Sequence, residues 1–397
     1  MARRIVGFGV LLLVAGSLMP TAGAAPGVTR TTIKIGLHAP LTGASPLPSD
    51  SIEKGKDLYF RWQEKNGGDI RGRTVNVILR NDQYNPSTAV SVCKQMVEQD
   101  HVFMLVGISG ADQVTACARY AASVGVPYVS PGMATRYLKQ LPTYFATTMT
   151  WGGQGRLMGR YLIDRLNARD RKNGSVTFDS PTFDEARAGF LRGMDAPGVQ
   201  VDYDRKVATG AGSTEARAVV EEMKLAGIQN AFISTTPVWF LQLLQQANTQ
   251  GFDPSWVGID QGIAKDTVAD VGCRGGGSFD GARFFSPYPA VAESDRFDPA
   301  FRNASRHFYP SKTPDDFMWQ LWALDKTVAK MLALPGADLT RTRFVNRVER
   351  ADRIATGIAP TLHYTPSDHF GANSTHVLKA DCSDRRWHTV ATFKQRF

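Results

Sequence analysis

The chain alternates between short apolar runs and longer segments in which apolar residues recur every three or four positions. The short runs have the length and the Val, Ile and Phe content of buried strands, and the longer segments have the period of amphipathic helices. The predicted strands span residues 33–37, 74–82, 102–107, 127–130, 144–149, 174–180, 199–207, 230–235 and 255–260. The predicted helices between them span residues 49–68, 85–99, 112–125, 154–166, 183–194, 214–227 and 238–251. This order predicts an α/β fold with parallel central sheets flanked by helices.

The strand–helix pattern falls into two units of similar size, which meet near residues 147–153 without a Ser- or Gly-rich linker. Beyond residue 284 the pattern loosens. It still predicts helices at 315–334 and 340–351 and final strands at 375–381 and 387–393. These late elements are expected to join the two existing lobes, which pack around a shared cleft. The expected limits are 31–150 plus 284–362 for the first lobe and 151–283 plus 363–397 for the second.

The first 24 residues (1–24) have the form of a secretory signal peptide. Arg3 and Arg4 precede an apolar stretch, and residues 22–24 have the small side chains of a cleavage site. The first Cys is Cys93, so no Cys near the cut offers a lipid attachment, and no later stretch is long and apolar enough to span a bilayer. The mature protein is therefore expected to be soluble and exported, either periplasmic or at the cell surface.

The positive charge of the chain is dispersed. The formal net charge of +9 falls to +7 when Arg3 and Arg4 leave with the signal peptide. The remaining basic clusters, at 169–174, 341–350 and 384–388, lie far apart in the sequence. Nucleic-acid binding requires basic residues concentrated on one face, so no nucleic-acid partner is predicted.

Four Cys in an exported chain favour two disulfides, with three possible pairings. Cys93 and Cys117 fall on consecutive predicted helices, which lie side by side in a βαβ unit, so this pair is favoured. Cys273 and Cys382 would then form the second bond. Buried free thiols are the alternative. No C-x-x-C motif occurs, so the sequence predicts no zinc site.

Candidate ligand-binding residues follow the predicted strands. In an open parallel sheet, ligands bind beyond the carboxyl ends of the strands, where helix N-termini point their N–H groups. Several of these turns are rich in small polar residues, including "SGAD" at 109–112 and "SPGMAT" at 130–135. Turns from both lobes are expected to face each other across the cleft. The residues expected to bind a ligand are Ser109, Gly110, Ala111, Asp112, Ser130, Ala134, Thr135, Phe183, Thr236, Asp260 and Gln261.

Sequence signals for catalysis are poor. The chain has no G-x-S-x-G, no H-E-x-x-H and no Walker phosphate loop, and its seven His show no ligand-like spacing. One alternative is an NAD-type oxidoreductase that uses Gly153, Gly155, Gly159 and Asp179. The spacing of these glycines, G-x-G-x-x-x-G, departs from the dinucleotide pattern. Close helix packing is the favoured role of these glycines, and neither catalysis nor a cofactor is predicted.

The segments "IKIGLHAPLTG", "NPSTAVSVCKQMVEQDHVFMLVG", "GVPYVSPG" and "GFDPSWVG" resemble the ABC-transporter solute-binding proteins for branched-chain amino acids, the leucine/isoleucine/valine-binding type. The resemblance runs from about residue 31 to the end and is strongest over 33–138. It implies the type I periplasmic-binding fold, with two Rossmann-like lobes joined by three crossovers. It also implies a small-molecule ligand trapped by hinge closure and an ABC permease as membrane partner. A monomer is expected, and an extracellular ligand-sensing module is a further alternative.

The family's ligand contacts carry over only in part. The resemblance implies a Ser/Thr run where this chain has residues 110–112, which lack hydroxyls. It implies a Thr at Ala134, beside Thr135, and a Tyr where Phe183 stands nearest. Asp260 is the matching acid for a ligand ammonium. Backbone N–H groups survive these changes but side-chain hydroxyls do not, so the ligand is expected to be another amino acid, an amide or another small amphipathic metabolite rather than leucine, isoleucine or valine. Asp112 would also repel a nearby carboxylate.

Overall fold

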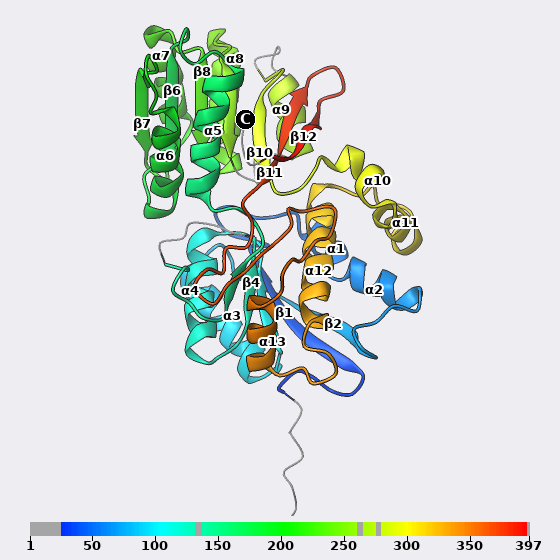
Figure 1. Cartoon of the computed structure of the whole chain (residues 1–397). Coiled ribbons are helices and arrows are strands. Elements are labelled where there is room, and N and C mark those ends of the chain that lie inside the picture. Colours follow the sequence, from blue (N-terminus) through cyan, green and yellow to red (C-terminus); the bar gives the residue numbers. More distant parts are fainter. Residues whose placement is uncertain (1–24, 132–136, 260–264, 275–278, 395–397) are drawn as a thin grey trace, which may run out of the picture.

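Two α/β lobes stacked on each other make up the molecule (Figure 1). The computed structural model describes residues 25–131, 137–259, 265–274 and 279–394. The expected signal peptide lies outside these residues. Within them, no helix combines the length and the apolar character needed to cross a membrane.

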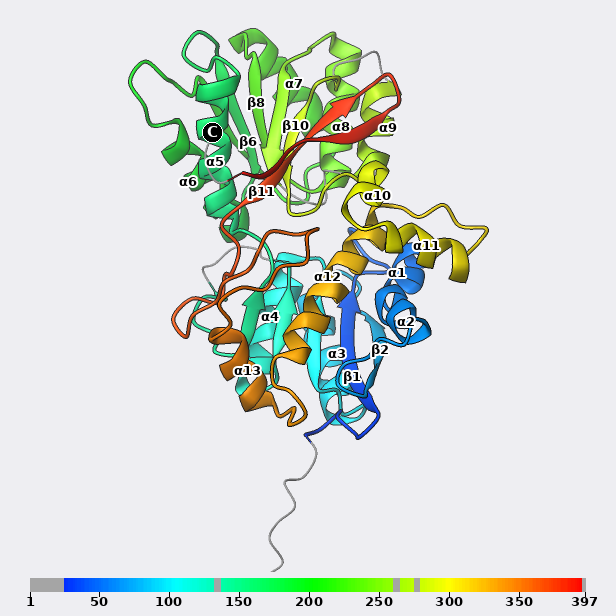
Figure 2. The ribbon, with the colours of Figure 1, turned by 45° about the vertical axis from the view of Figure 1, so that its right-hand side comes forward.

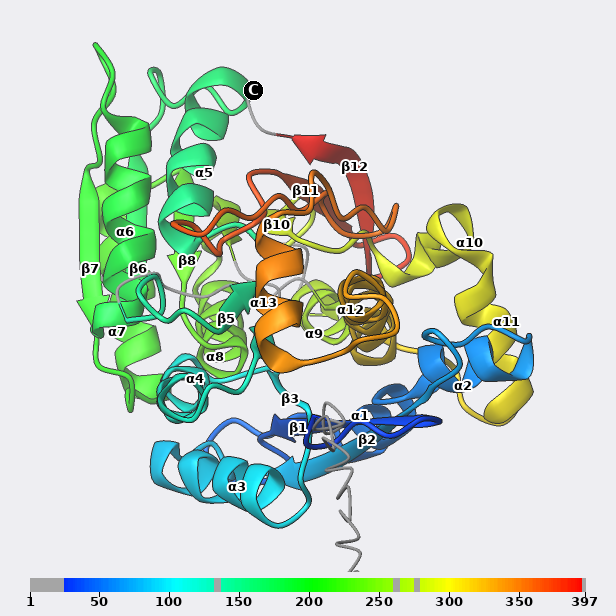
Figure 3. The ribbon, with the colours of Figure 1, turned by 60° about the horizontal axis from the view of Figure 1, so that its bottom comes forward.

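The first lobe contains a five-stranded, fully parallel sheet in the order β2-β1-β3-β4-β5. Its strands are β1 (Thr32–Ala39), β2 (Thr74–Asn81), β3 (Met104–Gly107), β4 (Tyr128–Ser130) and β5 (Tyr144–Ala146). Its helices are α1 (Ser49–Gly55), α2 (Leu58–Lys65), α3 (Pro86–Glu98), α4 (Ala111–Ser123), α11 (Pro299–Phe308), α12 (Asp316–Ala333) and α13 (Arg341–Glu349). Helices α12 and α3 lie on opposite faces of this sheet, as Figure 3 shows from below.

The second lobe contains a seven-stranded sheet in the order β12-β11-β10-β9-β8-β6-β7. Its strands are β6 (Asn173–Phe178), β7 (Tyr203–Val207), β8 (Asn230–Ser234), β9 (Ser255–Ile259), β10 (Arg283–Ser286), β11 (Thr375–Asp381) and β12 (Arg386–Lys394). Its helices are α5 (Trp151–Arg165), α6 (Pro181–Met194), α7 (Ser213–Ala226), α8 (Pro237–Gln250) and α9 (Asp266–Arg274). Only β11 pairs antiparallel, with β10 and β12; the other pairs are parallel.

Three crossings connect the lobes (Figure 2). The chain leaves the first lobe between β5 and α5. It returns after β10 through the 3-10 turn Val291–Glu293 and α10 (Ser294–Phe297), and crosses again before β11. The expected limits between the lobes, at 283/284 and 362/363, stay predictions. Strand β10 of the second sheet begins at residue 283, and Phe370 forms a bridge with Ala146 of the first sheet.

Three apolar clusters form the core. One packs α1, α2, α12 and α13 on the first sheet, and another packs α7, α8 and α9 on the second. The middle cluster contains buried residues of α3, α4, α5 and α6 and strand residues of both sheets. Because the same apolar cluster includes residues of both lobes, the lobes are joined by packing as well as by the three crossings.

The prediction of one continuous helix over 49–68 is wrong. The chain forms α1 and α2 separately, because the backbone turns at Asp57 (φ −140°, ψ 8°). Pro48 is the N-cap residue of α1, and no side chain caps this helix. Gly55 allows close approach to α12, since a Cβ there would lie 2.9 Å from a methyl carbon of Leu321. The break therefore lets two short helices follow the α12 surface.

Each lobe contains one disulfide, in the pairing that the sequence favoured. Cys93–Cys117 joins α3 to α4, with a Cα–Cα distance of 6.1 Å and a sequence separation of 24. Cys273–Cys382 joins α9 to the β11–β12 hairpin, with a Cα–Cα distance of 5.2 Å and a separation of 109. The second bond therefore attaches the end of the chain to the middle of its second half.

Glycines hold α5 and α6 unusually close. A Cβ at Gly155 would overlap the carbonyl oxygen of Ala186, and one at Gly159 would lie 2.7 Å from the carbonyl oxygen of Phe190. On α6, a Cβ at Gly189 would overlap the carbonyl oxygen of Gly152. These glycines therefore face a neighbouring backbone, which is the packing role favoured for them over dinucleotide binding.

Candidate functional site

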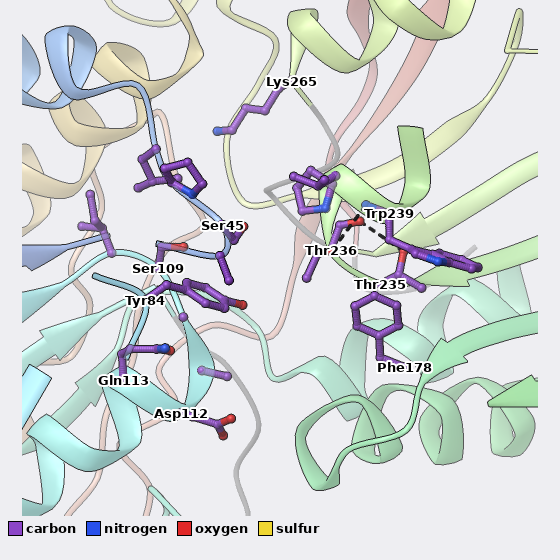
Figure 4. A pocket seen from close by; sticks show the side chains of 18 of the residues that line it. Ser45, Tyr84, Ser109, Asp112, Gln113, Phe178, Thr235, Thr236, Trp239 and Lys265 are labelled. Carbon is purple, nitrogen blue, oxygen red and sulfur yellow. Dashed lines mark hydrogen bonds between the residues drawn. The ribbon is translucent and has the colours of Figure 1, made fainter. Parts of the chain in front are cut away.

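A cavity of about 690 Å³ lies between the lobes, at the carboxyl ends of strands from both sheets (Figure 4). Its first-lobe wall comes from the turns after β1, β2, β3 and β4 and from α12. Its second-lobe wall comes from the turns after β6, β7, β8 and β9 and from the start of α5. The volume lies within the range of small-molecule sites, roughly 300–1,000 Å³.

At the start of α4, the first-lobe wall is built from backbone and small residues, whereas α12 contributes the larger Phe317, Leu321 and Leu324. Ser109, Gly110, Ala111 and Asp112 all line the cavity at the start of α4. Gly110 has φ 80°, a left-handed value that favours glycine, and its carbonyl oxygen accepts the first intrahelical hydrogen bond, from Val114 N–H. The earlier N–H groups of α4 therefore lie outside the helical ladder, as at every helix N-terminus.

A buried polar network supports this wall. His38 Nδ1 lies 2.7 Å from Asp82 Oδ2, and His38 Nε2 lies 2.6 Å from the Tyr128 hydroxyl. Asp82 also accepts a hydrogen bond from the backbone N–H of Tyr84, which lines the cavity. Burial raises the pKa of Tyr128 well above its usual value, so this hydroxyl stays protonated. The network therefore fixes the ends of β1, β2 and β4 relative to each other.

His38 also lies close to Cys93 and Cys117 within the described residues. Both sulfurs belong to one disulfide, so neither offers the thiolate that a metal ion requires. This cluster is structural.

The second-lobe wall is aromatic. A continuous series of rings, Trp151, Phe183, Phe178 and Trp239, has successive centroid distances of 5.1, 5.5 and 5.6 Å. The Thr236 hydroxyl caps α8 by accepting a hydrogen bond from the backbone N–H of Trp239, so the helix that carries Trp239 begins at the cavity wall (Figure 4). This wall offers a ligand apolar ring faces and edges.

Lys265 lies at the edge of the cavity where the two lobes touch. Its side chain is only 2% exposed, and its ammonium lies 4.8 Å from the centre of the Phe317 ring on α12. The next residue, Asp266, donates its N–H to the carboxylate of Asp316 across the lobes at 3.0 Å. Burial, and then the negative charge of Asp266, raise the pKa of Asp316 to about 7. The contact between the lobes therefore includes an acid that titrates near neutral pH.

The structure brings together six of the expected ligand-binding residues around the cavity. These are Ser109, Gly110, Ala111, Asp112, Phe183 and Thr236. Ser130 is fully buried, and its hydroxyl lies 2.8 Å from the Tyr144 hydroxyl. Its neighbour Pro131 lines the cavity instead. Ala134, Thr135, Asp260 and Gln261 lie outside the described residues.

Other cavity residues were not identified from the sequence. Phe178 and Trp239 lie next to strand ends that the prediction had located, so the strand-end rule could have reached them. Lys265 lies six positions beyond the end of β9, and nothing in its local sequence marks it. The Pro-rich turn at 44–48 after β1 also lines the cavity; it directly follows the segment 33–43 that carries the resemblance, and the sequence prediction did not include it.

Asp179, the acid of the oxidoreductase alternative, lies outside the cavity lining. Its carboxylate pairs with Lys206 at 2.6 Å on the surface, where 62% of the Asp179 side chain is exposed. Gly155 and Gly159 pack against α6. The residues of the oxidoreductase alternative therefore do not come together around a dinucleotide site.

Two lobes whose strand ends face one cavity define a two-lobed ligand-binding protein. The family model for periplasmic binding proteins matches residues 32–385, so the chain belongs to the periplasmic binding protein family. Its fold is the type I fold of the branched-chain amino acid binding proteins, as the resemblance indicated.

Relatives with different named ligands match most of the chain. A leucine-, isoleucine-, valine-, threonine- and alanine-binding protein of Pseudomonas aeruginosa is 22% identical over 369 residues, 91% of each chain. A fatty acid ABC transporter substrate-binding protein from Thermomonospora curvata has a TM-score of 0.79 at 20% identity, with 94% of both chains covered. A solute-binding protein from R. palustris in complex with benzoate has a TM-score of 0.74 at 16% identity, covering 91% of this chain and 96% of the other.

Proposed function

We propose that this protein is the extracytoplasmic solute-binding component of an ABC importer, and that it traps a small amphipathic metabolite between its lobes by hinge closure. The observation that carries the proposal is the cavity between the lobes, which strand-end loops of both sheets line. A ligand in this position touches both lobes at once, so it favours the closed arrangement over the open one. Membership of the periplasmic binding protein family supports the export of the chain and a membrane permease as partner.

The ligand contacts proposed for the first lobe are backbone N–H groups and small side chains at 109–112. Those proposed for the second lobe are Phe183 and Thr236. The relatives' names span branched-chain amino acids, fatty acids and benzoate, all of which pair a charged end with an apolar body. We propose a ligand of this general kind, bound by a monomeric protein without catalysis.

The test combines ligand identification with a measurement of closure. Compounds that co-purify with the exported protein are released by denaturation and identified by mass spectrometry. They are then added back to ligand-free protein, and small-angle X-ray scattering measures the radius of gyration. A bound small metabolite that lowers the radius of gyration is the expected result. Stabilisation by dinucleotide alone, with no response to amino acids or small acids, would instead favour the oxidoreductase.

A further inference from the structure

The two disulfides differ in their exposure to solvent. Cys93 and Cys117 are both fully buried, in the middle apolar cluster. Cys273 and Cys382 are both partly exposed, at the end of α9 and in the turn between β11 and β12. Thiol–disulfide exchange begins when a thiolate attacks a disulfide sulfur, so its rate depends on access to that sulfur. A reductant in solution should therefore reduce Cys273–Cys382 much faster than Cys93–Cys117.

Helix α9 is attached to the β11–β12 hairpin at both of its ends (Figure 1). At the first residue of the helix, Asp266 accepts a hydrogen bond from the Trp387 backbone N–H at 3.1 Å. The Trp387 indole N–H donates a second hydrogen bond to the backbone carbonyl of residue 265 at 3.0 Å. At the other end, the disulfide joins Cys273 to Cys382. Of these three connections, the disulfide is the one that a reductant removes.

Helix α9 has little apolar surface of its own to keep it folded. It has nine residues, and helices of this length are marginal in water by themselves. Its buried residues are small, namely Val268, Ala269 and Gly272, whereas α8 buries two aromatic rings and two Leu side chains. Loss of the disulfide should therefore make local unfolding of α9 easier without unfolding the whole lobe.

The start of α9 belongs to the cavity wall and to the contact between the lobes. Thr267 and Val268 line the cavity. The backbone N–H of Asp266 donates a hydrogen bond across the lobes to the carboxylate of Asp316 on α12, at 3.0 Å. A ligand in the cavity and the closed arrangement of the lobes therefore both depend on an ordered α9.

We infer that Cys273–Cys382 is a redox-sensitive switch, in which the disulfide holds α9 in the cavity wall and its reduction by a dithiol loosens α9 and releases the ligand. The inference rests on the proposed ligand-trapping function and adds a means of control to it. In the oxidised protein the cavity wall is complete. In the reduced protein it is complete for only part of the time, and the apparent Kd of the ligand rises as that fraction falls.

The reduction is an exchange between one disulfide and one dithiol. One thiolate of the dithiol attacks either sulfur of Cys273–Cys382, and the S–S bond breaks to release the other Cys as a thiolate, which takes up a proton. The second thiol of the dithiol loses its proton and displaces the first Cys from the mixed disulfide, and this Cys is protonated in turn. Two electrons therefore pass to the protein, which ends with two thiols, and the reductant leaves as a disulfide.

The first test uses the parent protein, with dithiothreitol as the dithiol. Alkylation by iodoacetamide and peptide mass spectrometry follow the appearance of each thiol with time. Cys273 and Cys382 are expected to become labelled at least about 10-fold faster than Cys93 and Cys117, because of their exposure. Hydrogen exchange then compares the oxidised and the selectively reduced protein, which requires no ligand. Protection over 265–274 is expected to fall on reduction, and protection of α4 is expected to stay unchanged.

The second test measures trapping with matched variants. Mass spectrometry identifies the metabolite that co-purifies with the oxidised protein, and equilibrium dialysis measures its Kd with and without dithiothreitol. Dithiothreitol is expected to raise the Kd of the parent protein about 10-fold, the change that follows when α9 is folded for about a tenth of the time. The double variant Cys273→Ser, Cys382→Ser should have the raised Kd from the start and not respond to dithiothreitol. The control, Cys93→Ser with Cys117→Ser, should still respond.

Reoxidation should return the parent protein to its original Kd, and this reversal decides the question even where a variant does not fold. Equal labelling of the two disulfides, unchanged exchange of α9, or an unchanged Kd after selective reduction overturns the switch and leaves the trapping function intact. A response to dithiothreitol that persists in the Cys273→Ser, Cys382→Ser variant also overturns the switch. A protein that carries no metabolite when purified and never changes its radius of gyration overturns the trapping function, and the switch with it.

Discussion

The two walls of the cavity differ in what they offer a ligand. The first-lobe wall at 109–112 presents backbone and small side chains at the start of α4. The second-lobe wall presents four aromatic rings and the buried ammonium of Lys265. Backbone N–H groups are the same in every residue except proline, whereas rings and charges depend on the sequence. We therefore propose that the turn at 109–112 is a general anchor and that the second-lobe wall decides which ligand fits.

The same contrast holds for the way each lobe is held together. The first lobe links two neighbouring helices through Cys93–Cys117 and fixes its strand ends through the network around His38. The second lobe depends on distant connections, namely Cys273–Cys382 and the Trp387 contacts to 265–266. Its consecutive helices α5 and α6 also pack closely through glycines. Changes that remove long-range connections should therefore destabilise the second lobe more than equivalent changes in the first.

The disulfides provide the largest expected difference. Removing Cys273–Cys382 as a double Ala variant should lower the free energy of unfolding by about 5 kcal/mol, and removing Cys93–Cys117 by about 3.5 kcal/mol, from the loop entropy of the sequence separations of 109 and 24. Urea unfolding of both variants and the parent measures this. A larger loss from the Cys93–Cys117 pair would contradict the contrast between the lobes.

The next largest effect on stability is expected from the glycine packing between α5 and α6. Gly155→Ala should lower the free energy of unfolding by about 2–4 kcal/mol, because the new Cβ overlaps the Ala186 carbonyl oxygen and forces α5 from α6. The control on the same helix is Gly153→Ala, where the nearest atoms are the ends of the Thr150 and Met149 side chains. Guanidinium unfolding compares them. If Gly153→Ala were the more damaging variant, helix packing would not be the role of this glycine series.

The alternation of periods was enough to predict most of the fold. Strand and helix order in both lobes follows from apolar spacing, and strand ends in parallel sheets meet at one edge. That rule identified 109–112 and Thr236 without knowledge of any contact. The apolar spacing failed at 49–68, where it predicted one helix in place of α1 and α2. The turn at Asp57 lets both helices pack on α12, which lies more than 250 residues further along the chain.

The second-lobe wall was less predictable for a physical reason. A backbone wall needs only a strand, a turn and a helix in order, which are local features. Lys265 becomes part of the cavity because Trp387 and α12 enclose it, and both are distant in sequence. The sequence prediction did not include helix α9 or strand β10. Strand β10 is short, and its antiparallel partner β11 lies about ninety residues later in the chain.

Titration of Asp316, at the contact between the lobes, should change the free energy of unfolding by a smaller amount that depends on pH. The folded-state pKa of Asp316 is about 7, above its usual value of 3.8. Between these values the folded protein keeps a proton that the unfolded chain has lost, so stability falls as pH rises from about 4 to 7 and then levels off. Asp316→Asn cannot ionise and still offers an oxygen to Asp266 N–H, so it should avoid this loss.

The melting temperature of Asp316→Asn relative to the parent should therefore rise between pH 5 and pH 8. The gain corresponds to about 1–3 kcal/mol, since one pKa unit equals about 1.4 kcal/mol. Buried acids that do not act on Asp316 titrate alike in both proteins and cancel in the difference, whereas Asp266, whose charge acts on Asp316, contributes to it. Asp338→Asn, an exposed acid paired with Arg343, is the control and should show a flat difference. A flat difference for Asp316→Asn would mean that this acid stays ionised in the folded state.

The smallest effects separate the two walls directly. Ser109→Ala keeps every backbone N–H of the α4 start, so it should change the affinity for the co-purifying ligand less than about 2-fold. Trp239→Phe keeps an aromatic ring but removes the buried Nε1–H, so it should weaken binding by about 3- to 10-fold, the usual effect of one hydrogen bond. Titration calorimetry at constant pH measures both variants. If Ser109→Ala had the larger effect, a hydroxyl of the first lobe would select the ligand, and the division between a general anchor and a selective wall would have to be reversed.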